Sequence, residues 1–98
     1  MPRSTSPNKH LETISSARFV RVPASQTNFA VRSTAGRLLR VVLNTNGGTV
    51  TLKNGQSEVI GIIATDAPEQ TFHYGVYCGN GIYVDTGATA DATIVFSD

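Results

Sequence analysis

The residues that could carry catalytic or metal chemistry are few in this 98-residue chain, and they are scattered. There are two histidines, His10 and His73, and one cysteine, Cys78. A metal site needs several His, Cys or carboxylate ligands at defined spacings. Neither histidine has such neighbours in the sequence, which therefore predicts no metal site and no cofactor.

Nucleophilic or phosphate chemistry is not indicated either. Serine, histidine and aspartate occur without a nucleophile elbow or another activating motif. Gly79-Asn80-Gly81 resembles part of a phosphate-binding loop, but it joins two expected strands and has no helix N-terminus behind it to hold an anion. Asp85, Asp91 and Asp98 are expected on turns or at the terminus, without the dense oxygen pattern of a calcium loop. We expect a protein that is not an enzyme.

Cys78 belongs to a strictly alternating segment. Phe72, Tyr74, Val76 and Cys78 alternate with other residues, a pattern typical of a strand with one buried face. We therefore expect Cys78 to be a small buried hydrophobe, since free cysteine is among the most buried residue types. His73, on the opposite face, is expected to point outward.

Eight short segments of β-type residues must position these side chains, and no helix is clearly indicated. They cover residues 18–22, 28–33, 37–44, 49–53, 57–64, 71–78, 81–86 and 91–97. A chain of this length forms one domain. Eight short antiparallel strands with short connections predict an all-β fold, an antiparallel β-sandwich, with the jelly roll as one candidate arrangement.

The turns and faces of these strands can also be predicted. Asn46-Gly47-Gly48 and Asn54-Gly55 both have the residues of hairpin turns, because they tolerate positive φ. Gly61 indicates a bulge or a close backbone approach. In the third segment, we expect Leu39 to share one face with Val41 and Leu43.

Residues 1–16 differ from the rest and are expected to form an extended N-terminal arm, followed by a β-sandwich domain at 17–98. The arm is polar, with two prolines and few sizeable apolar residues. Fixing one residue's backbone costs roughly 1–2 kcal/mol. A segment of this composition cannot offset that cost alone, so we expect another chain to hold it.

Charge is unevenly distributed along the chain. Residues 1–40 contain seven lysines and arginines and one glutamate, whereas residues 41–98 contain one lysine and six carboxylates. Such asymmetry bears on partners and steering rather than on fold. Either the first half forms a basic surface, or the strands interleave and the charges mix. We do not expect nucleic acid as a partner, because Tyr74, Tyr77 and Tyr83 lie in the acidic half of the sequence and not among the arginines.

The N-terminal residues MPRSTSPNKH have no apolar centre of the kind found in signal peptides. No apolar run approaches the roughly 20 residues that span a bilayer. We expect synthesis in a cytosol and no contact with a membrane.

Two parts of the sequence resemble small structural proteins of tailed bacteriophage virions. The matching residues are Gly47, Gly48, Thr49, Val50 and Leu52, followed by Gly81, Ile82, Val84, Gly87, Ala90, Thr93, Val95 and Phe96. The resemblance covers roughly residues 36–97. It implies a β-sandwich of the virion, commonly a cement or decoration protein on the capsid surface that forms a homotrimer and binds the major capsid protein.

On this hypothesis the site residues fall into two groups. Arg3, Lys9, Arg18 and Arg21 would bind carboxylates of the capsid, and Tyr74, Tyr77 and Tyr83 would contact sister subunits, because tyrosine is enriched at interfaces. Two alternatives stay open. One is a tail, neck or fibre-base component, and the other is a module that binds host glycans by stacking tyrosines on sugar rings.

Overall fold

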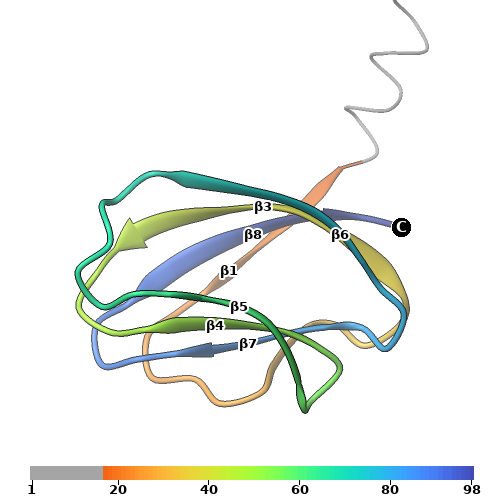
Figure 1. The fold of residues 1–98 in the computed structure, drawn as a ribbon, viewed down its shortest axis with the longest axis horizontal. Helices are drawn as coiled ribbons and strands as arrows, with labels where there is room; N and C mark the ends of the chain where they lie inside the picture. The colour runs from red at the N-terminus through yellow and green to blue at the C-terminus, as the bar shows by residue number, and fades with distance from the viewer. Residues whose placement is uncertain (1–16) are drawn as a thin grey trace, which may run out of the picture.

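The structure is a computed structural model, which describes residues 17–98 (Figure 1). Its eight strands are β1 (Arg18–Val22), β2 (Phe29–Arg32), β3 (Gly36–Thr45), β4 (Val50–Asn54), β5 (Glu58–Ile63), β6 (Thr71–Cys78), β7 (Ile82–Thr86) and β8 (Asp91–Ser97). All eight predicted segments are confirmed to within one residue at either end. The predicted arm at 1–16, with Arg3, Lys9 and His10, lies outside the described residues.

The strands form two antiparallel sheets of four strands, in the orders β1-β8-β3-β6 and β2-β7-β4-β5. Only β4 and β5 are consecutive in the chain and also paired. This order is that of a jelly roll, so the predicted β-sandwich takes its jelly-roll form. No helix that could cross a membrane occurs in the described part of the chain.

One predicted turn has a different role. Asn46-Gly47-Gly48 does not close a hairpin, because β3 and β4 belong to different sheets. It carries the chain from one sheet to the other, and the amide of Gly47 donates to the carbonyl of Thr65 (3.1 Å). The hairpin at Asn54-Gly55 is confirmed, since β4 pairs with β5 and Gly55 has a φ of +73°.

The core lies between the two sheets and consists of inward-facing residues of their strands, together with Ala90 just before β8. It is made of Val22, Val31, Leu38, Val41, Leu43, Val50, Leu52, Ile63, Cys78, Ile82, Val84, Ala90, Ala92, Ile94 and Phe96. Aliphatic side chains dominate this list, as expected for strands that each bury one face. The predicted burial of Cys78 is confirmed.

The predicted faces of β3 are wrong at one residue. Leu38, not Leu39, shares the buried face with Val41 and Leu43, and Leu39 is only half-buried. The reason is a register shift between Leu38 and Arg40 toward both neighbouring strands. An extra residue in one strand of a ladder moves the residues after it to the opposite face.

Candidate functional site

The side chains that could take part in catalysis or metal binding do not lie together in a catalytic arrangement. Cys78 is fully buried, and this burial raises the pKa of its thiol. His73 is exposed on β6, as predicted. Within residues 17–98, no three His, Cys, Asp or Glu side chains lie close enough to hold a metal ion.

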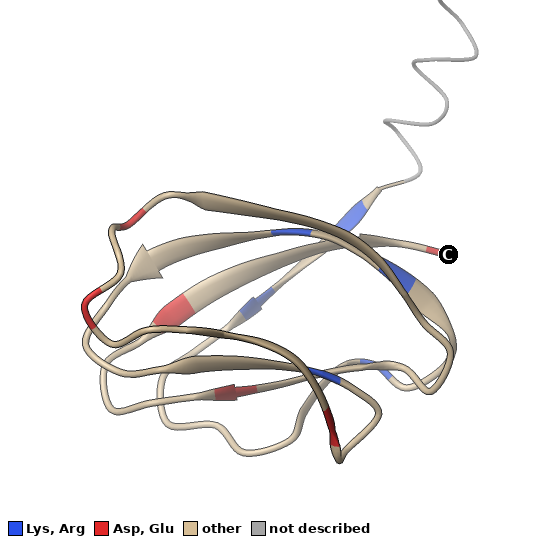
Figure 2. Cartoon of the chain, in the orientation of Figure 1, with Lys and Arg blue, Asp and Glu red and all other residues tan. Residues whose placement is uncertain are grey.

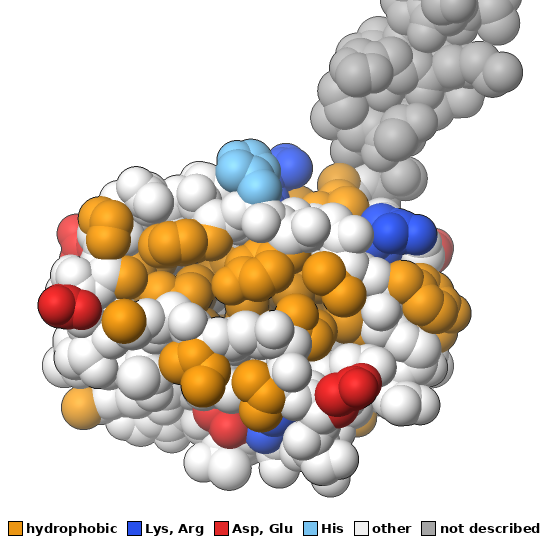
Figure 3. Space-filling model, viewed as in Figure 1, with side chains coloured by type: hydrophobic (Ala, Val, Ile, Leu, Met, Phe, Trp, Pro, Cys, Tyr) orange, Lys and Arg blue, Asp and Glu red, His pale blue; other side chains and the backbone are white. Residues whose placement is uncertain are grey.

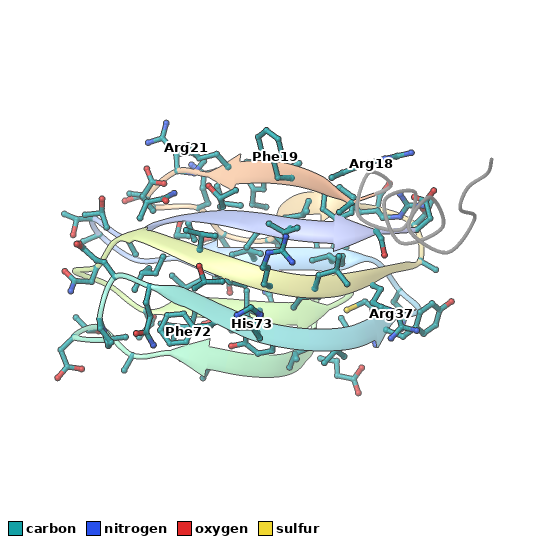
Figure 4. The ribbon with its side chains drawn as sticks, turned by 90° about the horizontal axis from the view of Figure 1, so that it is seen from above. Arg18, Phe19, Arg21, Arg37, Phe72 and His73 are labelled. Carbon is teal, nitrogen blue, oxygen red and sulfur yellow. The ribbon has the colours of Figure 1, made fainter. Side chains whose placement is uncertain are left out.

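The first surface of interest is β1, which is the border strand of its sheet. The predicted partner-binding residues Arg18 and Arg21 are both exposed there, and Phe19 between them is 74% exposed (Figure 4). We did not select Phe19 from the sequence. The signal was present, because Phe19 alternates with Val20 and the buried Val22, so its side chain must point outward.

Charges from the two halves of the chain meet along this border. Arg21 donates to both carboxylate oxygens of Asp91, with Nε 3.0 Å from Oδ1. Asp98 lies 2.8 Å from Arg32 and 3.7 Å from Arg18. The alternative in which the charges mix is therefore confirmed for these residues, and Figure 2 shows both signs on both sheets.

A second charge cluster joins β4, β7 and the loop before β2. The ammonium of Lys53, whose side chain is only 8% exposed, lies 3.0 Å from Asp85 and donates to the side chain of Asn28. Asp85 also accepts the backbone N–H of Asn28 at 2.6 Å. Asp85 and Asp91 lie on β7 and β8, so their predicted place on turns is wrong.

Both carboxylates have a pKa below the ordinary value. Burial opposes ionisation of Asp85, but the Asn28 N–H and the Lys53 ammonium outweigh it and lower the pKa. The pKa of Asp91 is lowered mainly by its hydrogen bonds from Arg21. Each group therefore stabilises the folded state in its ionised form.

We expect stability to be lost in acid. A carboxyl with a lowered pKa contributes fully above its unfolded value of about 3.9, and the contribution disappears as pH falls through the lower folded value. Urea unfolding between pH 6 and about pH 2 should show a free energy that is flat down to about pH 5 and then decreases. The variant Asp91→Asn should show a shallower decrease, and an unchanged slope would contradict the role assigned to Asp91.

The outer face of the sheet β1-β8-β3-β6 combines arginines with aromatic residues. Strand pairing places Arg37 opposite Tyr77, and Arg40 opposite His73. Arg37 and Arg40 make no ion pair within residues 17–98. Arg37 and Tyr77 thus lie side by side although they belong to different halves of the sequence, because β3 and β6 are distant in sequence but adjacent in the sheet.

The three tyrosines predicted at a subunit interface lie on three different surfaces. Tyr77 is exposed on the outer face of β6. Tyr74, also on β6, packs inward, where its ring would lie 3.4 Å from a Cβ added at Gly61. Tyr83 is half-buried on β7 and pairs with Lys53, on the outer face of the other sheet.

Gly61 is therefore a position of close approach, as predicted, because the Tyr74 ring lies against its backbone. It leaves room for the ring of Tyr74, and the register of β5 against β4 shifts beside it. The contact lets the ring reach from one sheet to the other at their open border, and burial raises the pKa of the Tyr74 hydroxyl.

The second surface of interest is this open border, which we call the apolar edge. β5 and β6 each end a sheet there. Ile60, Phe72, Tyr74 and Val76 are half-buried against the core, while Val59 and Ile62 are largely exposed. Figure 3, viewed as in Figure 1, shows hydrophobic side chains gathered in a band between β6 and β5. The sequence predicted these strands but not that both would end a sheet.

The residues that carry the phage resemblance have a structural role. Gly48 comes from its first part and Gly87 from its second, and a Cβ added at either would lie 2.7 Å from the Cα of the other. The amide of Gly87 donates to the carbonyl of Thr49 at 2.9 Å. Two turns that cross between the sheets thus pack backbone against backbone.

No protein-family model, curated protein or solved structure matches this chain. The resemblance to virion proteins accordingly stays a prediction from the sequence. Function must be argued from the two borders of the sandwich.

Proposed function

We propose that the protein is a structural component of a bacteriophage virion, a capsid cement protein that joins neighbouring major capsid subunits on the outer surface of the shell. The observation that supports this most is the contrast between two borders of one compact sandwich. One border offers arginines around an exposed phenylalanine, and the other offers apolar side chains. A cement protein needs two such contact surfaces on a stable domain. Because a jelly roll serves many functions, the fold alone does not carry the proposal.

The β1 border is suited to bind a protein surface with exposed carboxylates. The side chains of Arg18 and Arg21 are more than half exposed. An ion pair exposed on both sides, such as Arg18–Asp98, contributes about 0–1 kcal/mol, so a capsid carboxylate can replace Asp98 at little cost. Arginine and large aromatic residues also dominate the binding energy of protein interfaces, which gives Phe19 a role as an apolar anchor.

The N-terminal residues extend this contact in our proposal. Arg3 and Lys9 lie outside the described residues, and β1 follows the segment that contains them. An arm that begins at the β1 border would add contacts to the same capsid surface. Many copies on one shell would then multiply modest contacts into large particle stability. The homotrimer implied by the resemblance stays a prediction.

Deletion of residues 1–16 tests the proposal. Undecorated capsids are mixed with the full chain or with the shortened chain, and bound protein is measured after sedimentation. We expect the shortened chain to keep its β-type circular dichroism and thermal unfolding, but to bind at least about tenfold more weakly. Binding of the full chain should weaken as salt is raised, because exposed charges are screened.

Undiminished attachment of the folded, shortened chain would refute the role of the arm. The substitutions Arg18→Gln and Arg21→Gln should also weaken attachment, whereas Glu58→Gln, in an exposed residue on the far border, serves as the matched control. Copy number in purified particles separates the shell from the tail. Hundreds of copies indicate the shell, whereas a dozen or fewer indicate the tail, neck or fibre base.

A further inference from the structure

The two open borders of the sandwich differ in how their unpaired strands are protected. β5 has one neighbour, β4, and β6 has one neighbour, β3, so both strands present an unpaired side. Natural sheets protect such borders with charged side chains, proline, bulges or very short strands, and among these devices β5 and β6 each have a register shift against their neighbour. The opposite border is protected by charge and by a short strand, because β1 carries Arg18 and Arg21 and β2 is only four residues long.

Charge is absent from the strands of the apolar edge. No Asp, Glu, Lys or Arg occurs from Val59 to Ile63 or from Thr71 to Cys78. The nearest charged residues are Glu58, at the start of β5, and Asp66 and Glu69, in the connection between the strands. Two copies of this edge can therefore meet without placing like charges against each other.

We propose that a second copy of the chain covers the apolar edge, with the edge of one copy packed on the edge of the other across a two-fold axis. Two-fold contacts are self-complementary, so they require a surface compatible with itself. An uncharged band with Ile60, Phe72, Tyr74 and Val76 meets that requirement, whereas the arginine-bearing β1 border would repel its own copy. The contact also buries Ile62, which is 62% exposed in the single chain.

Light scattering after size-exclusion chromatography, on the free chain from micromolar to millimolar concentration, tests this proposal. We expect a mass that rises toward twice 10.4 kDa. Ile62→Lys should raise the dissociation constant roughly tenfold or more, because it places a charge in an apolar contact. Phe19→Lys, an equivalent change on the opposite border, is the matched control and should leave the constant unchanged.

Hydrogen exchange supplies a readout that does not depend on a substitution. Amides of β6 should exchange more slowly as concentration rises, while those of β1 should not change. A monomer at every concentration would overturn the proposal, and so would the homotrimer that the resemblance to virion proteins implies. The proposal would also fail if Phe19→Lys weakened the dimer and Ile62→Lys did not. It would fail as well if neither substitution changed the dissociation constant and hydrogen exchange in β6 did not depend on concentration. These measurements need no capsid, so they are independent of the proposed function.

Discussion

Replacing Asp85 with alanine is expected to lower the free energy of unfolding at neutral pH by about 3–5 kcal/mol. The substitution leaves the ammonium of Lys53 buried, with only the side-chain oxygen of Asn28 and the carbonyl of Gln56 (3.4 Å) as partners. An uncompensated buried charge is far more costly than the lost attraction itself. Urea unfolding followed by circular dichroism measures the change.

Removing the other partner should matter much less. In Lys53→Met the side chain keeps its length and apolar contacts, and the remaining carboxylate is 35% exposed and still accepts the N–H of Asn28. We expect a loss of about 1 kcal/mol or less, since apolar replacement of a buried pair is often nearly neutral. The double variant should resemble Lys53→Met. Asp66→Ala, in an exposed loop residue, is the control and should stay within about 0.5 kcal/mol.

The two single variants together test this cause. A buried ammonium without its carboxylate remains only in Asp85→Ala, so this variant should lose at least about 2 kcal/mol more than Lys53→Met. Equal losses in the two variants would show that the Lys53 charge is not the cause.

The sequence predicted the strands of this fold more fully than their partners. Hydrophobic alternation is local, and it was enough to locate β6 and β8 with correct ends. Pairing depends on residues far apart in the chain. Turn preference is local too, so Asn46-Gly47-Gly48 could be recognised as a turn from its residues alone. Those residues carry no information on the pairing of β3, whose neighbours are β6 and β8.

The same limit applies to the faces of β3. Strict alternation placed Leu39 on the buried face, whereas the register shift beside it buries Leu38. A bulge is set by how three neighbouring strands fit together. No residue type in this segment marks it in advance, unlike Gly61, where a glycine within an apolar run indicated a close approach.

The candidate surfaces were only partly accessible to sequence reasoning. The exposure of Arg18 and Arg21 could be predicted from their polarity. Their ion pairs with Asp98 and Asp91 join residues about eighty and seventy positions apart, so these pairs could be found only from the fold. Tyr74, Tyr77 and Tyr83 were selected by residue type, and only the fold shows that they lie on different surfaces. The apolar edge arises from sheet order alone.

Replacing Gly48 with alanine is the second change for which we expect a large effect, a loss of about 2–3 kcal/mol of stability. A Cβ at this position would lie 2.7 Å from the amide of Ala88 and from the Cα of Gly87. Backbone cannot move aside as the end of a flexible side chain can, so the two crossing turns must separate. Gly87→Ala should have a similar effect, since its Cβ would meet the Cα of Gly48 at 2.7 Å and the amide of Thr49 at 2.9 Å.

Gly79→Ala is the matched control, because its Cβ would meet only the ring of Tyr77, at an ordinary 3.6 Å. Restricting the unfolded chain should make this variant neutral or more stable by up to about 1 kcal/mol. The double variant at Gly48 and Gly87 should lose less than the sum of the single losses, because separating the turns for one methyl group makes room for the other. An equal loss of stability in Gly79→Ala and Gly48→Ala would show that any glycine-to-alanine change in a turn is harmful. The close contact between Gly48 and Gly87 would then not be the reason why glycine occupies both positions.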